Sequence, residues 1–261
     1  MTILDEIVSN KRDELVEYKR ALPIQVLKGS VFFDRPCLSL ASRLRNSDTG
    51  IIAEFKRRSP SKGFINQVAD VLQVTAGYES YGATGISVLA DNKFFAGGPT
   101  FVQKARTVVS RTPILFKEFV VDPYQIYLAK ASGADAVLLI ASLLDAETSR
   151  ELTDLAHVLG LEVLYELYEP EELERIPETA DMVGVNNRNL RTFEVDVDRA
   201  LGMLKQVPDH HVKVAESGLS DPQTVKRLRD EGVRGFLMGE HFMQQANPAA
   251  ALGKFMMDLY K

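Results

Sequence analysis

Short apolar runs alternate with stretches of helical periodicity along the chain from residue 51 onward. The apolar runs have the length of buried strands and lie at residues 51–56, 85–90, 113–119, 136–141, 162–166, 182–186, 212–216 and 235–239. The helical patterns lie at residues 68–81, 100–109, 123–132, 146–159, 170–176, 195–206, 221–231 and 248–259. Because strands and helices alternate, the pattern predicts a parallel sheet.

Eight strand–helix units predict a closed (β/α)8 TIM barrel better than an open sheet. The open, doubly wound sheet is the alternative, but no GxGxxG motif follows the first strand, which weakens a dinucleotide-binding interpretation. Residues 4–21 have the pattern of an amphipathic helix. We therefore expect a single domain over residues 1–261, with an N-terminal helical extension (1–50) followed by the barrel (51–261).

Individual residues mark where the expected helices begin and end. Four glycines follow helices as C-terminal caps do, namely Gly82, Gly133, Gly160 and Gly232. Asp145 and Ser220 are the expected N-caps, because short polar side chains accept hydrogen bonds from the first-turn N–H groups.

The composition excludes several classes of function. A net charge of −5 gives no electrostatic reason to expect nucleic acid or an anionic membrane as partner. Cys37 is the only cysteine and the four histidines form no HExxH-like motif, so neither a disulfide nor a metal site is expected. No apolar run approaches the ~20 residues of a spanning helix, and the N-terminus lacks a signal core. A cytoplasmic location is the expectation.

Polar side chains lie at the C-terminal ends of the expected strands, where barrel enzymes carry their chemistry. Glu54 and Lys56 are two residues apart on the first strand and therefore point to the same side. The further candidates are Lys117, Glu166, Asn186, Arg188, Glu216, Ser217 and Glu240. In a barrel, all of these residues meet at one mouth.

Each candidate also has a structural interpretation. Glu54 and Lys56 have the spacing of a structural ion pair, and Glu166 could simply cap the next helix. Asn186 and Arg188 are common in turns, and Glu216 could pair with a lysine without reacting. Asp91, which follows the second strand, is interpreted as structural because aspartates are common in loops.

Three small residues indicate a phosphate ligand. Ser59 lies in a tight Ser-Pro-Ser-Lys-Gly loop, and Gly218 and Gly239 follow the seventh and eighth strands. Barrels often present backbone N–H groups to phosphate there, and glycine allows close approach, although such glycines also serve as plain turns. Phe94 and Phe95 either line a ligand pocket or belong to the core.

Four motifs resemble those of one known family. They are residues 52–63 (IAEFKRRSPSKG), 116–126 (FKEFVVDPYQI), 185–190 (VNNRNL) and 215–218 (AESG). Residues 93–97 (KFFAG) and 3–7 (ILDEI) fit the same family. In this order and over nearly the whole chain, they resemble indole-3-glycerol-phosphate synthase of tryptophan biosynthesis.

The resemblance implies a (β/α)8 barrel with a helical segment over its mouth, and a carbon–carbon lyase that needs no cofactor. The implied reaction converts 1-(o-carboxyphenylamino)-1-deoxyribulose 5-phosphate into indole-3-glycerol phosphate, carbon dioxide and water. Lys117 is then the general acid and Lys56 the second acid or the anchor of the substrate carboxylate, and Glu54 or Glu166 is the base or a charge stabiliser. The other implied site residues are Asn186, Glu216, Arg188 and Ser217, with Ser59, Gly218, Gly239 and Glu240 at the phosphate. The apolar N-terminal segment is expected to enclose the aromatic ring together with Phe94, Phe95 and Leu190.

The chain departs from the family's usual motifs at several positions, namely Ala90, Phe116, Glu118, Tyr168, Glu240 and His241. An ionised Glu240 cannot donate a hydrogen bond to phosphate, so backbone N–H groups have to serve there. None of these departures changes Lys56, Lys117 or the three candidate glutamates. A lysine in a partly apolar barrel is expected to have a lowered pKa, which suits an acid.

Two rival functions also fit a phosphate-binding barrel. A phosphoribosylanthranilate isomerase needs a Cys/Asp acid–base pair, and Cys37 lies before the first strand, in the wrong place. A non-catalytic subunit that binds a phosphorylated metabolite is the second rival, and the intact lysines and glutamates argue against it. The expected partner is a small phosphorylated substrate, and association with other enzymes of the pathway stays open.

Overall fold

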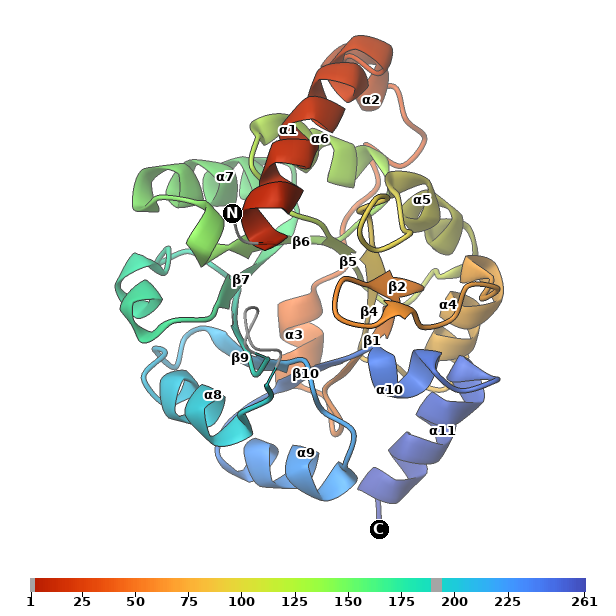
Figure 1. The fold of residues 1–261 in the computed structure, drawn as a ribbon, viewed down its shortest axis with the longest axis vertical. Coiled ribbons are helices and arrows are strands. Elements are labelled where there is room, and N and C mark those ends of the chain that lie inside the picture. The colour runs from red at the N-terminus through yellow and green to blue at the C-terminus, as the bar shows by residue number, and fades with distance from the viewer. Residues whose placement is uncertain (1–2, 189–193) are drawn as a thin grey trace.

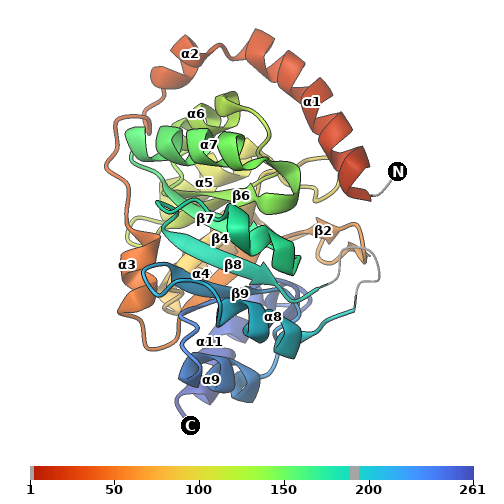
Figure 2. The same ribbon diagram turned by 90° about the vertical axis from the view of Figure 1, so that its left-hand side faces the viewer.

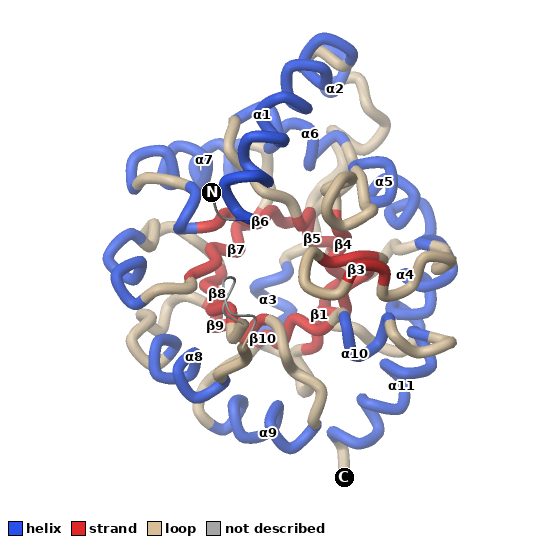
Figure 3. Tube along the Cα trace, in the orientation of Figure 1, coloured by secondary structure: helices blue, strands red, loops and turns tan. Residues whose placement is uncertain are grey.

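The computed structural model describes residues 3–188 and 194–261. Within them, a closed barrel is formed by β1 (Ile51–Phe55), β4 (Gly85–Leu89), β5 (Ile114–Lys117), β6 (Ala136–Ile140), β7 (Glu162–Leu167), β8 (Met182–Asn186), β9 (Val212–Glu216) and β10 (Gly235–Met238). Neighbouring strands are parallel, and β10 pairs with β1, which closes the ring seen in Figure 3. The predicted closed barrel is confirmed, and the open sheet is excluded.

Helices surround the barrel and cover the outer face of its strands (Figure 1). They are α4 (Val71–Ser80), α5 (Pro99–Val108), α6 (Pro123–Ala131), α7 (Ala146–Val158), α8 (Val197–Leu204), α9 (Pro222–Asp230) and α11 (Pro248–Leu259). Asp145 caps α7, as expected. The expected cap Ser220 is wrong: Asp221 caps α9 by accepting from Gln223 and Thr224, because Pro222 takes the first helical position. The four expected C-terminal glycines all have positive φ angles.

Several short elements differ from the expectation. Residues 170–176, expected as an α-helix, form the 3₁₀ helix η2 (Pro170–Arg175). Elements that the pattern missed are α2 (Ile24–Lys28), α3 (Leu40–Arg45), η1 (Ala141–Leu143), α10 (Glu240–Met243) and the hairpin of β2 (Arg58–Ser59) with β3 (Gly63–Phe64). Each is six residues or shorter, which is too short to show a hydrophobic period.

The N-terminal segment covers both ends of the barrel. Helix α1 (Ile3–Ala21) lies at the end where the strands finish, whereas α3 lies at the opposite end (Figure 2). Leu40 and Leu44 of α3 are fully buried against the start of the strands. Gly85 and Gly235 begin β4 and β10, and a Cβ at either would lie 2.5 Å from Leu40 Cδ1 or 3.2 Å from Leu44 Cδ1, respectively. Helix α3 therefore fills the closed end of the barrel. The division into a 1–50 extension and a 51–261 barrel within one domain stays a prediction.

No helix in the two described ranges is long and apolar enough to cross a membrane.

The role of α3 can be tested through stability. Replacing the fully buried Leu44 with alanine removes apolar contacts and leaves a cavity, so Leu44→Ala is expected to lower the free energy of unfolding by about 2–5 kcal/mol. Val158→Ala on the exposed face of α7 is the control and is expected to change it by less than about 1 kcal/mol. Urea denaturation measures both, and equal losses would contradict a packing role for α3.

Candidate active site

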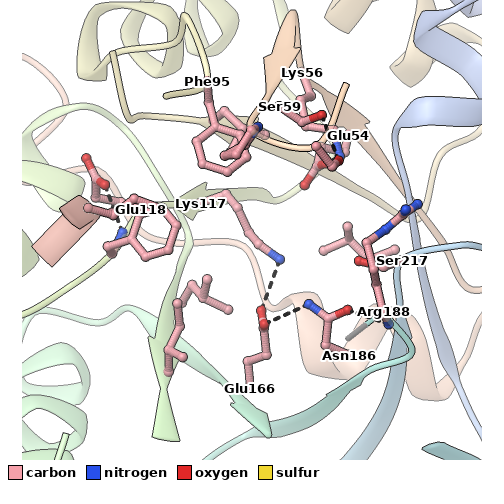
Figure 4. Close-up of a pocket in the computed structure, with 18 of the residues that line it drawn as sticks. Glu54, Lys56, Ser59, Phe95, Lys117, Glu118, Glu166, Asn186, Arg188 and Ser217 are labelled. Carbon is pink, nitrogen blue, oxygen red and sulfur yellow. Dashed lines mark hydrogen bonds and ion pairs between the residues drawn. The ribbon is translucent and has the colours of Figure 1, made fainter. Parts of the chain in front are cut away.

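Side chains at the C-terminal ends of the strands meet in one opening (Figure 4). The expected site residues that line it are Glu54, Lys56, Ser59, Phe95, Lys117, Glu166, Asn186, Arg188, Ser217 and Glu240. Gly218 and Gly239 line an adjoining pocket that shares part of this wall. Glu216 lines neither pocket, because its side chain is buried behind Lys117. The expected convergence on one mouth is therefore seen.

Lys117 ends β5 and lies between two carboxylates from other strands, Glu166 on β7 and Glu216 on β9. Its Nζ is 2.6 Å from Glu216 Oε2 and 3.4 Å from Glu166 Oε2. Burial by itself lowers the pKa of Lys117, but the negative charges of Glu216, Glu166 and Glu54 outweigh burial and raise this pKa above its ordinary value. The expected lowering of the pKa is wrong, because the sequence pattern did not show that these carboxylates surround one ammonium group. Lys117 is accordingly protonated at neutral pH.

Glu216 is the most confined carboxylate of the site. Burial raises its pKa, the nearby charge of Glu166 raises it further, and Lys117 opposes both. Gly184 on β8 provides the space that Glu216 occupies: a Cβ at this glycine would lie 2.1 Å from Glu216 Oε1. The pair Glu166 and Glu216 shares one lysine, which makes this the part of the site best suited to hold or exchange a proton.

Glu54 and Lys56 form the second charged pair. Lys56 Nζ lies 3.0 Å from Glu54 Oε1, which confirms that the two side chains share one side of the strand. Ser87 on β4 donates to Glu54 Oε2 at 3.2 Å. Burial raises the pKa of Glu54, but Lys56 and Lys117 outweigh it and lower this pKa, so Glu54 is ionised at neutral pH.

Asn186 connects the strand ends on the far side of the opening. Its Nδ2 donates to Glu166 Oε1 at 3.0 Å, and its Oδ1 accepts from the backbone N–H of Arg188 at 2.9 Å. The Arg188 side chain reaches Glu240, with Nη2 3.3 Å from Oε2. Asn186 thus orients a carboxylate and the following loop at once, which exceeds what a plain turn residue does.

One pocket of the opening, here called the aromatic pocket, contains the lysines and is partly apolar. Phe95 and Phe119 lie together in its wall, with ring centroids 5.8 Å apart. Its remaining apolar wall includes Ile3, Leu4 and Ile7 of α1 and Leu89, Leu138, Ile140 and Leu237 of the barrel. Phe94, which was one candidate for this wall, is not among the lining residues and packs nearly buried under Lys93. Leu190 lies outside the described residues.

The adjoining pocket, here called the glycine pocket, shares six residues with the aromatic pocket: Glu54, Lys56, Arg188, Ser217, Leu237 and Glu240. Its other lining residues are Val195, Gly218, Leu219, Ser220, Met238, Gly239, His241 and Gln244. Ser217 and Gly218 have φ angles of 67° and 70°, a conformation that turns the backbone sharply after β9. A Cβ on Gly239 would lie 2.7 Å from Glu54 Oε1. Glycine at this position therefore permits the close approach of the backbone to the charged pair.

Glu240 enters the glycine pocket as an ionised group. Burial raises its pKa, but Lys62 outweighs burial, with help from Arg188 and Lys56, and lowers this pKa. Lys62 Nζ, from the β2–β3 hairpin, is 2.7 Å from Glu240 Oε1. Sequence reasoning missed Lys62 because its motif does not show that the β2–β3 hairpin folds back to the end of β10.

Asp91, interpreted as structural, is fully buried and accepts hydrogen bonds from the backbone N–H groups of Phe94 and Phe95 at 2.7 Å and 3.2 Å. The N-terminal segment was expected at this pocket as a whole, and Ile3, Leu4 and Ile7 are the residues of it that line the wall, whereas Phe119 was missed as a lining residue. In residues 3–188 and 194–261, no group of three or more His, Cys, Asp or Glu is placed to hold a metal ion.

Comparison with known proteins agrees with this geometry. The model of the family "Indole-3-glycerol phosphate synthase" matches residues 4–255. A protein of that name from Bacteroides thetaiotaomicron is 48% identical over 254 residues, covering 97% of this chain and 97% of the relative. Another from Salinibacter ruber is 44% identical over 256 residues, covering 97% of this chain and 95% of the relative.

A solved structure resembles the fold alone. A mutant tryptophan synthase α-subunit from Pyrococcus furiosus aligns with a TM-score of 0.60 and 19% identity, covering 82% of this chain and 98% of that chain. This likeness supports the barrel architecture and carries nothing about the chemistry.

Because the Glu216 side chain fills the space beside Gly184, a larger residue at this position of β8 is expected to destabilise the protein. Gly184→Ala places a methyl group against Glu216, so the free energy of unfolding is expected to fall by about 1–3 kcal/mol. Gly202→Ala is the matched control: nothing lies within 4 Å of a Cβ there, and its α-helical position favours alanine. Urea denaturation compares them. A loss in Gly184→Ala no larger than in Gly202→Ala would show that Glu216 moves aside freely.

Proposed function

The chain belongs to the indole-3-glycerol phosphate synthase family, and we propose that its pocket closes, decarboxylates and dehydrates 1-(o-carboxyphenylamino)-1-deoxyribulose 5-phosphate. Family membership makes the protein a lyase of tryptophan biosynthesis. The assignment of reaction steps to residues is the part proposed here. The observation that carries it is the protonated Lys117, which lines the aromatic pocket between two buried carboxylates, while the glycine pocket adjoins the same opening.

The shape of the opening supports this substrate. The molecule has an aromatic ring with a carboxylate at one end, a ketone in the middle and a phosphate at the other end. The aromatic pocket supplies Phe95, Phe119 and the apolar side of α1 for the ring. The glycine pocket supplies Gly218, Gly239 and their neighbours for the phosphate, and Lys117 in the aromatic pocket serves the ketone.

Ring closure needs an acid at the ketone. The ring carbon that carries the carboxylate attacks the carbonyl carbon, and the carbonyl oxygen receives a proton as the new carbon–carbon bond forms. Lys117 is protonated and its ammonium group faces the opening, so it is the proposed donor. Glu166 and Glu216 hold this ammonium group in place and stabilise it.

Decarboxylation follows because ring closure leaves an iminium group that accepts electrons. The bond between the ring and the carboxylate breaks, its electron pair flows toward the iminium nitrogen, and carbon dioxide leaves. Lys56 and Arg188 are the cations that can hold the substrate carboxylate before this step. The ionised Glu54 stabilises the positive nitrogen.

The last step removes the hydroxyl group made during ring closure. An acid protonates it so that it leaves as water, and a base takes a proton from the neighbouring carbon to complete the indole. Lys56 is the proposed acid, and Glu54 or Glu166 is the proposed base. Two paired groups, Lys56 with Glu54 and Lys117 with two glutamates, provide both roles.

The phosphate site is proposed at the glycine pocket. The backbone at Gly218, Gly239 and Glu240 offers N–H donors there, and the buried Ser59 offers a hydroxyl group from the wall of the aromatic pocket. Lys62 and Arg188 add positive charge there but are paired with Glu240. The expected lack of a cofactor, the cytoplasmic location and the question of protein partners stay predictions.

Lys117→Met tests the main acid. Because methionine cannot donate a proton, turnover is expected to fall by at least about 10²-fold. Purified protein is incubated with the substrate without added metal, and the rise in indole fluorescence is followed. Lys205→Met, which removes an exposed lysine paired with Glu231, is the control and should keep full activity. Near-normal turnover in Lys117→Met would remove it from the acid role.

Glu166→Gln tests for proton transfer at the strand β7 end. Glutamine can still accept the hydrogen bond from Asn186 but cannot take a proton, so the turnover is expected to fall by about 10²–10⁴-fold. Glu231→Gln on the surface is its control. Unchanged turnover in Glu166→Gln, measured by the same fluorescence assay, would leave Glu54 as the base.

A further inference from the structure

A buried ion cluster lies beneath α1, outside the proposed chemistry. Lys11 of α1 is 2% exposed, and its Nζ lies 3.0 Å from Asp91 Oδ2 and 3.0 Å from Glu118 Oε2. Glu14, on the same helix, adds a third carboxylate at 2.6 Å. Asp91 follows β4 and Glu118 follows β5, so one lysine joins the N-terminal helix to two neighbouring strand ends.

The two barrel carboxylates of this cluster also position the aromatic pocket. Asp91 Oδ1 accepts the N–H groups of Phe94 and Phe95, which fixes the loop that carries Phe95. Glu118 Oε1 accepts the N–H group of Phe119 at 2.8 Å. Each carboxylate therefore binds Lys11 with one oxygen and holds the backbone of a lining aromatic residue with the other.

The helix contributes the third wall of the same pocket. Ile7 lies one helical turn before Lys11, so both side chains are on the face of α1 that is directed at the barrel. Ile3 and Leu4 continue this face to the end of the described helix and line the pocket with Ile7. Lys11 thus links the three segments that carry Ile7, Phe95 and Phe119.

We propose that Lys11 is a positioning residue that assembles the wall binding the aromatic ring of the substrate. This inference rests on the proposed function, because it assigns the ring to the aromatic pocket. Lys11 itself does not line the pocket.

The energetics support a positioning role over a purely stabilising one. Burying charged groups costs more than a buried apolar contact of the same size, so an apolar residue would hold α1 at least as well. One lysine also faces more than one carboxylate: burial, opposed by Lys11 and helped by Asp91, raises the pKa of Glu118 to about 7. Charged groups differ from apolar ones in that their hydrogen bonds are directional, so each carboxylate fixes the position of one loop.

The test compares two lysines of the same helix. Lys11→Met removes the central cation of the cluster. Lys19→Met is the matched control, because Lys19 also pairs with a barrel residue, Asp122 at 2.6 Å, but its side chain is 47% exposed. For each variant, KM and kcat are measured with the substrate, and binding of anthranilate and of inorganic phosphate is measured by calorimetry.

The expected result is a selective loss. Lys11→Met should raise KM and the anthranilate Kd at least tenfold, lower kcat less, and leave the phosphate Kd within twofold. Lys19→Met should change none of these by more than twofold. Equal weakening of anthranilate and phosphate, or equal behaviour of the two variants, would overturn the proposal, because a general loss of structure affects both pockets.

A second variant tests the proposal in case Lys11→Met alone does not fold. Lys11→Met combined with Glu118→Gln removes one of the three carboxylates that the lysine leaves behind, while glutamine still accepts from Phe119. The same selective loss of anthranilate binding is expected, with thermal unfolding followed by circular dichroism. If neither variant folds, Lys11 is structural and the proposal is overturned.

The calorimetry separates this inference from the proposed function. A wild-type protein that binds anthranilate but does not turn over the substrate would contradict the proposed function alone, and a selective loss in Lys11→Met would still support the positioning role. A wild-type protein with full turnover whose Lys11→Met variant keeps its KM would overturn the positioning role alone.

Discussion

A buried ammonium group shared by two carboxylates is the constraint on which the site depends. Lys117 extends from β5 across the barrel toward Glu166 on β7 and Glu216 on β9. None of these three charges is stable there without the others, because an unpaired charge in the interior is costly to desolvate. The closed barrel supplies the geometry, since closure places β9 on the opposite side of the ring from β5, with β7 between them. Space is a second condition, and it is met by the missing side chain of Gly184.

Much of this arrangement could be predicted from the sequence. Strands in a parallel barrel are buried on both faces, so they appear as apolar runs, and each expected strand lies within about two residues of the observed one. A strand period of two residues predicted that Glu54 and Lys56 share a side, and their contact confirms it. These features are local, and local periodicity is what a sequence displays.

The rest depends on contacts between distant segments. The direction of the Lys117 pKa shift was wrong because it is set by residues 49 and 99 positions away, whereas the sequence shows only the apolar neighbours on its own strand. Helix α3 was missed because its six residues are too few for a period, although its leucines fill the closed end of the barrel. The pairing of Lys62 with Glu240 joins the first loop to the last strand end. No short-range pattern contains such information.

The negative groups of the proposed substrate and the glutamates of the opening compete for the same positively charged side chains. A substrate that carries a carboxylate and a phosphate brings negative charge into a mouth where Glu54, Glu166, Glu216 and Glu240 already accompany Lys56, Lys117 and Arg188. Among the described residues, Arg188 and Lys62 contact the ionised Glu240, so a phosphate in the glycine pocket competes with Glu240 for them. Substrate binding there exchanges one anionic partner for another. Such an exchange leaves Arg188 and Lys62 with an anionic partner before and after binding. It does not involve Lys117, whose partners Glu166 and Glu216 are buried more deeply than Glu240.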